Sequence, residues 1–232
     1  YADKGESILV EPYPGADQKS LRIYLLCNPM AAIVHQRGFI PLHASGIITK
    51  EGVSLIIGHS GAGKSTTVKA LIKKGHKIFT DDVCVLKESD GKIKAIPSYP
   101  MIKLWENSFQ LLELKGNNEE SKIWPDLEKF GLLFHDQYIN DWIQVSNIFV
   151  LETDEQSLSV TAKMQTGLES FLAIGSNTYR SEYVEPMMLS HLHFIIVNKL
   201  ANQSPVYKIS RPVSNDTITQ VVEQIESKIS NQ

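Results

Sequence analysis

A glycine-rich segment that ends in a lysine and a serine is the first feature of this chain that could do chemistry. From Ile56 to Asp82 the sequence reads IIGHSGAGKSTTVKALIKKGHKIFTDD, and it fills every fixed position of the pattern G-x-x-x-x-G-K-[ST]. Glycines let the chain curl so that successive backbone N–H groups point at one anion, and a helix N-terminus adds partial positive charge. The pattern therefore predicts a loop that binds the phosphates of a nucleoside triphosphate such as ATP.

We call residues 58–65 the phosphate loop. Lys64 is expected to meet the β- and γ-phosphates, and the hydroxyl of Ser65 is expected to join the ligands of a Mg²⁺ ion. A glycine-rich turn with a chance lysine is the alternative, but a strand before the segment and a helix after it favour the phosphate site. The residues predicted to bind nucleotide are Gly58, Ser60, Gly61, Ala62, Gly63, Lys64, Ser65 and Thr66.

An acidic pair, Asp81 and Asp82, follows the loop after a single short helix. A strand beside the phosphate-loop strand would bring its carboxyl end, and so this pair, to the edge of the sheet where the γ-phosphate sits. One carboxylate can bind Mg²⁺ while the other accepts the proton of an attacking hydroxyl, which contributes about 100- to 10,000-fold in rate. A solvated Asp-Asp turn is the alternative interpretation.

His43 lies upstream on an apolar segment. If its strand pairs with the phosphate-loop strand, His43 can reach the same edge of the sheet, orient one aspartate and adjust its basicity. A lone histidine among apolar residues is more often a core residue, so both interpretations stay open.

These residues resemble a known family. The segment that begins LHASGII and ends KIFTDD is similar to the catalytic domain of bacterial HPr kinase/phosphorylase, where a histidine-bearing strand, a phosphate loop, a short helix and an Asp-Asp pair occur in this order. The resemblance implies an α/β fold of the phosphoenolpyruvate-carboxykinase-like P-loop type, with a mixed sheet and flanking helices. It also implies that His43 contacts a catalytic Asp81 that acts on the serine proton, and that Asp82 is the acidic neighbour, which we expect to bind the metal.

The chain departs from that family after the acidic pair. The family carries an E-x-R-G-x-G segment there, whereas this chain reads AIPSYPMIKLWENSF. The segment before Gly58 is also expected to be too short for the large N-terminal domain of the bifunctional enzymes. What remains resembles the stand-alone HPr-kinase-related proteins, several of which phosphorylate the C-terminal serine of a lasso precursor peptide.

The resemblance therefore implies a kinase for a peptide or small-protein serine, and a lasso precursor peptide is the best single choice of acceptor. HPr itself, a small-molecule substrate of the sugar-acid type and a non-catalytic ATP sensor are the alternatives. Arg180 is a candidate for stabilising phosphoryl charge, although an arginine near a helix end is more often solvated or paired with a carboxylate. Lys103, Tyr99 and Trp105 are candidates for the acceptor groove, with core packing equally open for Trp105.

The elements that must position these residues follow from hydrophobic periodicity. We expect one domain over residues 1–232, because the chain is long enough for one sizeable core. The pattern predicts helices over 64–74, 106–116, 167–182, 187–201 and 216–229, and an exposed loop over 117–122. It predicts strands over 39–48, 53–57, 77–80, 142–152, 157–164 and 206–210, a hairpin of 83–88 with 92–97, and a proline-bounded loop and strand over 97–105.

Composition limits the partners. A formal net charge of -3, without a run of lysine or arginine, gives no general attraction to nucleic acid. We expect no membrane span and no secretory leader, because no apolar run approaches the length that crosses a bilayer. The two cysteines, Cys27 and Cys84, lie far apart in apolar surroundings, which favours free thiols in a reducing cytoplasm. Self-association is left open.

Overall fold

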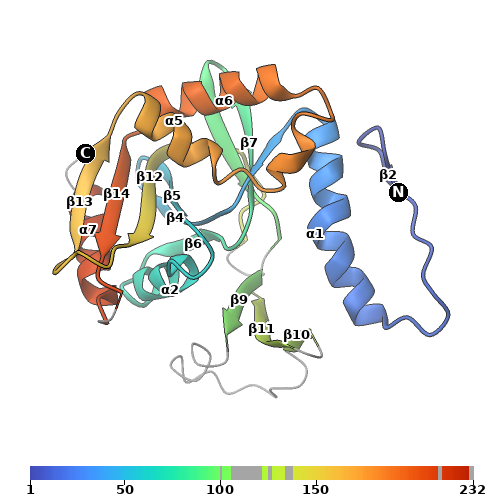
Figure 1. Cartoon of the computed structure of the whole chain (residues 1–232), viewed down its shortest axis with the longest axis horizontal. Coiled ribbons are helices and arrows are strands. Elements are labelled where there is room, and N and C mark those ends of the chain that lie inside the picture. Colours follow the sequence, from blue (N-terminus) through green and yellow to red (C-terminus); the bar gives the residue numbers. More distant parts are fainter. Residues whose placement is uncertain (100, 106–121, 125–126, 134–137, 214–215, 230–232) are drawn as a thin grey trace.

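A computed structural model describes residues 1–99, 101–105, 122–124, 127–133, 138–213 and 216–229, with the backbone alone for 102–105, 122–124 and 127–133. Figure 1 shows a large sheet flanked by helices, with a smaller sheet of three strands to one side. The small sheet holds β9 (Met101–Trp105), β10 (Lys122–Trp124) and β11 (Leu127–Leu133). A short hairpin, β1 (Ala2–Asp3) and β2 (Ser7–Ile8), begins the chain.

The large sheet has nine strands and a mixed topology, as the sequence predicts. Seven run in the order β3-β7-β8-β12-β5-β4-β6, and β14 extends the sheet by pairing with β12 and β13. The strands are β3 (Ile40–Leu42), β4 (Ala44–Thr49), β5 (Gly52–Ile57), β6 (Lys77–Thr80), β7 (Cys84–Ser89), β8 (Lys92–Pro97), β12 (Ile143–Thr153), β13 (Thr161–Gln165) and β14 (Val206–Arg211).

Helices cover both faces of this sheet, which explains why β5 is apolar without alternation. Ile56 faces one cluster with α2 (Lys64–Lys73) and α7 (Ile218–Ile229), which supply Leu71 and Val222. Leu55 and Ile57 face the other cluster, with α5 (Leu168–Gly175) and α6 (Ser190–Gln203). All three β5 residues are 0% exposed, so a strand buried on both faces anchors the phosphate loop.

The predicted strand over 39–48 is in fact two strands that meet at His43. Leu42 of β3 pairs with Cys84 of β7, whereas β4 pairs with β5 and β6. The chain changes partners at His43, whose N–H donates instead to the carbonyl of Asn177 at 2.8 Å. Because His43 belongs to neither strand, the alternation of side chains along β3 or β4 does not fix the direction of its side chain.

Other boundaries also differ from the prediction. The helix predicted over 167–182 ends at Gly175 and is followed by a short 3-10 turn at Ser181–Tyr183, and the strand predicted over 157–164 begins only at Thr161. The helix predicted over 106–116 lies outside the described residues, as does the loop predicted over 117–122 up to its last residue. The sequence patterns predict nothing before residue 38, yet α1 (Gln18–Gln36) is the longest helix in the described part of the chain and contains Pro29.

Candidate active site

Strand direction brings the candidate residues together. The strands β5, β12 and β14 are parallel, so their carboxyl ends lie at one edge of the sheet. Because β4 is antiparallel to both β5 and β6, the end of β6 and the start of β4 lie at that edge as well. The phosphate loop after β5, the acidic pair after β6 and His43 before β4 therefore converge, at the position where open α/β sheets bind ligands.

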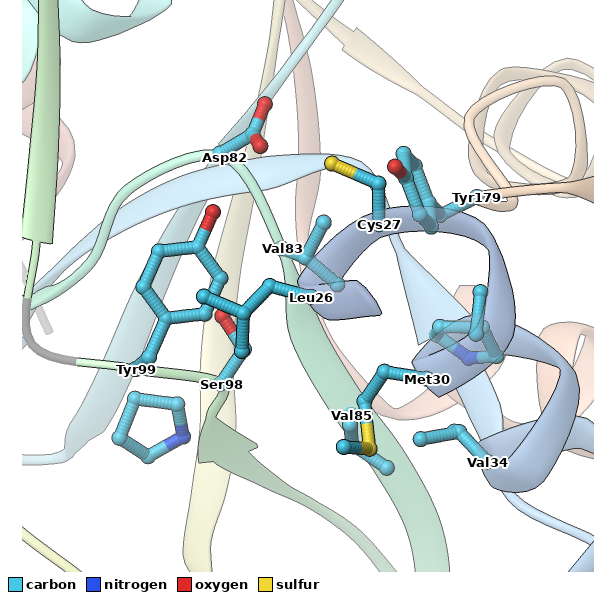
Figure 2. A pocket seen from close by; sticks show the side chains of 13 residues that line it. Leu26, Cys27, Met30, Val34, Asp82, Val83, Val85, Ser98, Tyr99 and Tyr179 are labelled. Atoms are coloured by element: carbon cyan, nitrogen blue, oxygen red, sulfur yellow. The ribbon is translucent and has the colours of Figure 1, made fainter. Parts of the chain in front are cut away.

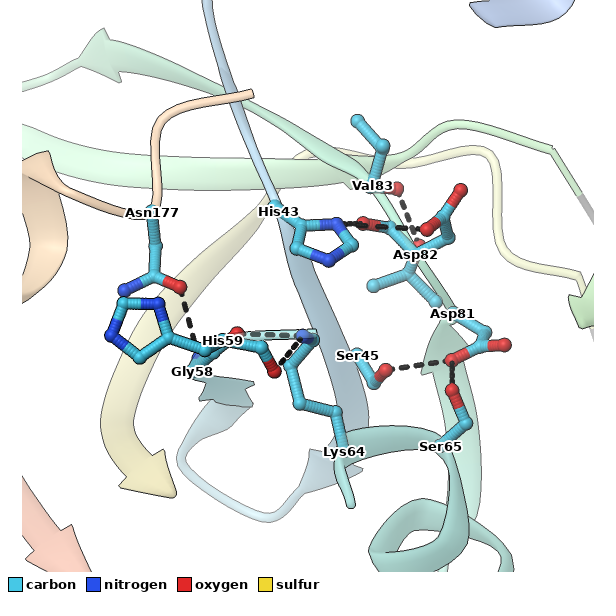
Figure 3. A network of polar contacts seen from close by, with 11 residues as sticks. His43, Ser45, Gly58, His59, Lys64, Ser65, Asp81, Asp82, Val83 and Asn177 are labelled. Carbon is cyan, nitrogen blue, oxygen red and sulfur yellow. Dashed lines mark hydrogen bonds and ion pairs between the residues drawn. The ribbon is translucent and has the colours of Figure 1, made fainter. Parts of the chain in front are cut away.

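The phosphate loop has the backbone that its glycines predict. Gly58 has φ 144°, and a Cβ there would lie 2.4 Å from the carbonyl oxygen of Leu151 on the neighbouring strand. Gly63 has φ 103° at the N-terminus of α2, a conformation that L side chains rarely adopt. Lys64 is 7% exposed, and its Nζ donates to the carbonyls of Gly58 at 2.6 Å and His59 at 3.2 Å, across the loop (Figure 3).

Asp81 is joined to the phosphate loop by a hydroxyl. Its Oδ1 accepts hydrogen bonds from Ser65 Oγ at 2.8 Å and from Ser45 Oγ at 2.6 Å, and the residue is 1% exposed (Figure 3). A buried carboxylate and a serine hydroxyl in contact are oxygen ligands of the kind that Mg²⁺ uses, together with phosphate oxygens and water. The residues present therefore fit this ion. Among the described residues, no group of three or more His, Cys, Asp or Glu side chains is arranged so that these side chains alone could hold a metal ion.

Asp82 is joined to His43 instead. His43 Nδ1 lies 2.8 Å from the backbone carbonyl oxygen of Asp82 and 3.6 Å from its Oδ1. Because a carbonyl only accepts, Nδ1 carries the hydrogen in this contact and Nε2 is left as the acceptor of a neutral ring. Asp82 has φ 79°, which is uncommon for a non-glycine residue and is found mainly at turns and functional sites.

The environment keeps His43 neutral near pH 7. Burial lowers the pKa of His43 below its ordinary value, and the positive charge of Lys64 lowers it further. Asp82 and Asp81 act in the opposite direction and do not reverse the shift. His43 therefore meets the acidic pair as an uncharged hydrogen-bonding group rather than as a cation.

Three residues at this site were not predicted. Ser45 contacts Asp81, as described above. Asn177, after α5, accepts a hydrogen bond from the N–H of Gly58 at 2.9 Å through Oδ1 and donates one to the carbonyl of Ala173 at 2.8 Å. Arg211, the last residue of β14, donates to the carbonyl of Ala62 through Nε and Nη2 at 3.4 and 3.3 Å. Arg211 could have been found, since it directly follows a predicted strand, but Asn177 falls within a predicted helix and carries no such signal.

A small cavity of about 200 Å³ is lined in part by residues of the phosphate loop. Its walls include Gly63, Thr66, Arg211 and Thr217. Thr217 is 4% exposed, and its Oγ1 has no hydrogen-bond partner among the described residues. A buried hydroxyl without a partner is costly unless a ligand satisfies it.

The remaining candidates are Arg180, Tyr99, Lys103 and Trp105. Arg180 Nη1 is 3.4 Å from Glu182 Oε1, which agrees with the carboxylate-paired interpretation, and its guanidinium lies over the ring of Tyr179. Tyr99 lines a second pocket beside Asp82. Lys103 and Trp105 belong to β9, and their side chains lie outside the described residues. Among the helices of the described residues, none is long and apolar enough to cross a membrane.

A mixed sheet with a phosphate loop after its central strand and an acidic pair at the same edge defines a P-loop fold of the kinase type. Curated HPr kinase/phosphorylases are similar to the chain, and the one from Clostridium botulinum (strain Eklund 17B / Type B) is 39% identical over 71 residues, which are 30% of this chain and 21% of that protein. The one from Clostridium perfringens (strain 13 / Type A) is 45% identical over 62 residues, 27% of this chain and 18% of its own. The chain is thus related to the HPr kinase family.

The matched segment spans only about a fifth of the length of these curated relatives. A solved structure, the Hpr(Ser) kinase/phosphatase from Coxiella burnetii, aligns with 82% of this chain and 94% of its own, at 17% identity and a TM-score of 0.43. No family model matches the chain.

Proposed function

We propose that this protein is an ATP-dependent kinase that transfers the γ-phosphate to a serine hydroxyl of a peptide. The observation that carries the proposal is the convergence of the phosphate loop, the Ser65–Asp81 contact and the His43–Asp82 contact at one edge of the sheet. A protein that only bound ATP would need the first two features, but it would have no use for a second carboxylate beside a neutral histidine that binds the backbone carbonyl of the same residue.

The two aspartates divide the work according to their contacts. In this assignment Asp81 and Ser65 would hold Mg²⁺, and the ion would neutralise charge on the phosphates. Asp82, whose backbone carbonyl accepts a hydrogen bond from His43, takes the proton of the attacking hydroxyl with its carboxylate. This differs from the roles that the family resemblance implies, which make Asp81 the base and Asp82 the metal ligand; the contact of Ser65 with Asp81 supports the new assignment.

The reaction is an in-line displacement. The acceptor oxygen forms a bond to the γ-phosphorus, the bond from that phosphorus to the β–γ bridging oxygen breaks, ADP leaves, and the proton passes to Asp82. Lys64 is buried against the loop carbonyls of Gly58 and His59, so its ammonium can exchange these oxygens for phosphate oxygens without leaving the loop. The cavity bounded by Arg211 and Thr217 is suited to the ribose or base of the nucleotide, since it adjoins Thr66 at the start of α2.

The acceptor we propose is the C-terminal serine of a lasso precursor peptide. The absence of the E-x-R-G-x-G segment after the acidic pair supports an acceptor other than HPr. A chain terminus also enters a narrow site more easily than an internal loop, because only one flank has to pass the rim. HPr and a sugar-acid type substrate remain the alternatives that the experiment must separate.

The experiment offers ATP and Mg²⁺ with four acceptors: a precursor peptide ending in serine, the same peptide extended by several residues, HPr, and a panel of sugar acids. A gain of one phosphate is followed by mass spectrometry. Labelling of the terminal serine alone is the expected result. Labelling of HPr or a sugar acid with both peptides untouched would reject the peptide kinase.

Two matched variants test the division of labour. Asp82→Asn should lower kcat by roughly 100-fold or more, with the KM for ATP held, because the group that takes the proton is lost. Asp81→Asn keeps an acceptor for Ser45 and Ser65 but loses the charge, so it should raise the Mg²⁺ concentration needed for half-maximal rate. If Asp81→Asn lowers kcat and Asp82→Asn raises the Mg²⁺ requirement, the roles are those that the family resemblance implies. Equal, small effects of the two variants would exclude both assignments.

A further inference from the structure

A pocket of about 210 Å³ lies between α1 and the strand edge of β3 and β7. Figure 2 shows Leu26, Met30 and Val34 of α1 on one side of it and Val85 of β7 on the other. The three helix residues are spaced four apart, so they form a single apolar stripe on α1. Packing with the sheet does not cover this stripe, because Leu26 is 41% exposed and Met30 is 42% exposed.

The polar groups of the pocket lie near the acidic pair. Asp82 is the one charged residue among the described residues that line the pocket, and Figure 2 shows it at one end, away from Val34. Tyr179, another lining residue, has its ring centroid 6.1 Å from that of His43. The pocket is therefore continuous with the proposed site of proton transfer rather than a separate hollow.

A hydroxyl in the wall also lacks a partner. Ser98 lines the pocket, and its Oγ is buried without a hydrogen-bond partner among the described residues. Burial of an unpaired hydroxyl is unfavourable, so an occupant that supplies an N–H or a carbonyl oxygen would gain from it. A peptide backbone carries both groups.

We propose that this pocket, which we call the α1 pocket, binds an apolar side chain of the acceptor peptide within two residues of the hydroxyl that is phosphorylated. The inference rests on the proposed function, because it takes Asp82 as the group that meets that hydroxyl. The size agrees: a cavity of about 150 Å³ in another protein holds benzene, so the α1 pocket can take one leucine- or phenylalanine-sized group. Specificity then comes from the residue beside the serine as well as from the serine.

The chain supplies its own probe for this pocket. Cys27 lines it, whereas Cys84, the other of the two cysteines, is 0% exposed and burial raises its pKa to about 12. A maleimide at neutral pH should therefore label Cys27 alone, and an occupant of the α1 pocket should slow that labelling. This readout requires no phosphoryl transfer, so it distinguishes failure of the pocket from failure of the kinase.

The experiment compares two kinds of peptide that differ only in the residues beside the serine. The apolar peptides carry leucine or phenylalanine there, and the control peptide carries alanine. The apolar peptides should protect Cys27 at concentrations roughly 10- to 100-fold lower than the alanine peptide, the ratio expected for burying one large apolar side chain. Met30→Glu should remove this preference. The matched control is Tyr24→Glu, which places the same charge on the same helix at a residue that is 53% exposed and does not line the pocket.

Equal protection by both kinds of peptide, or equal effects of the two variants, would overturn the inference. Protection that rises with protein concentration in the absence of peptide would also overturn it, because a second copy of the chain would then be the occupant. Apolar peptides that protect Cys27 without becoming phosphorylated would keep the pocket and reject the kinase. Phosphorylation that ignores the flanking residue and Met30→Glu would keep the kinase and reject the pocket.

Discussion

Asn177 provides the sharpest test of how the fold supports the phosphate loop. Its Oδ1 accepts a hydrogen bond from the N–H of Gly58, and its Nδ2 donates one to the carbonyl of Ala173. The residue is 8% exposed. In Asn177→Ala the carbonyl of Ala173 keeps the bond from Ser176 Oγ at 3.1 Å, but the buried N–H of Gly58 loses the acceptor described here. The main loss of stability therefore comes from the unpaired N–H of Gly58 in the phosphate loop.

A buried donor left without an acceptor costs about 1–3 kcal/mol. For a chain of this size each kcal/mol lowers the thermal midpoint by roughly 2–4 °C, so Asn177→Ala should melt about 2–12 °C below the parent. The stabilisation by ATP and Mg²⁺ should also shrink, because Gly58 begins the loop that holds the phosphates. In the parent that stabilisation is about 2.7 kcal/mol at one hundred times the dissociation constant.

The assay is thermal unfolding across a series of ATP concentrations, with Asn202→Ala as the matched control. Asn202 Nδ2 donates to the carbonyl of Asn198 at 2.7 Å in the same side-chain-to-helix geometry, but the bond is exposed to solvent and lies near the end of α6, before the start of β14. The control should melt within about 1 °C of the parent, as exposed substitutions usually change stability by less than about 0.5 kcal/mol. If both variants lose the same small amount and bind ATP equally, the anchoring role of Asn177 is refuted.

Two further predictions concern the loop and pH. Gly58→Ala should abolish the response of the thermal midpoint to ATP, because its Cβ would lie 2.4 Å from the carbonyl oxygen of Leu151 at φ 144°; the exposed Gly15→Ala is the control, and a normal ATP response in Gly58→Ala would contradict the loop geometry. Burial lowers the pKa values of His35, His43 and His193, so on acidification the unfolded chain takes up protons before the native chain does. Unfolding free energy from urea titrations should therefore fall as pH drops from about 6.5 towards 5, and a flat profile there would count against this burial.

The phosphate loop and its surroundings could be predicted from sequence because their signals are local. The glycines, Lys64 and Ser65 stand at fixed spacing between a strand and a helix, and the acidic pair follows the next strand. Helix and strand periods also identified β5, α2, β6 and the β7–β8 hairpin, since each buries a continuous or regular apolar pattern. Cytoplasmic location and the absence of nucleic-acid partners remain predictions.

Other features depended on contacts between distant segments. Helix α1 escaped prediction because Pro29 interrupts the pattern of a helix interior, and only its packing beside β3 creates the α1 pocket. Which aspartate meets Ser65 and which meets His43 could not be read from two adjacent carboxylates, because the positive φ of Asp82 sends their side chains to different partners. Asn177 and Arg211 reach the loop from more than one hundred residues away through the order and direction of the strands, which no local pattern encodes.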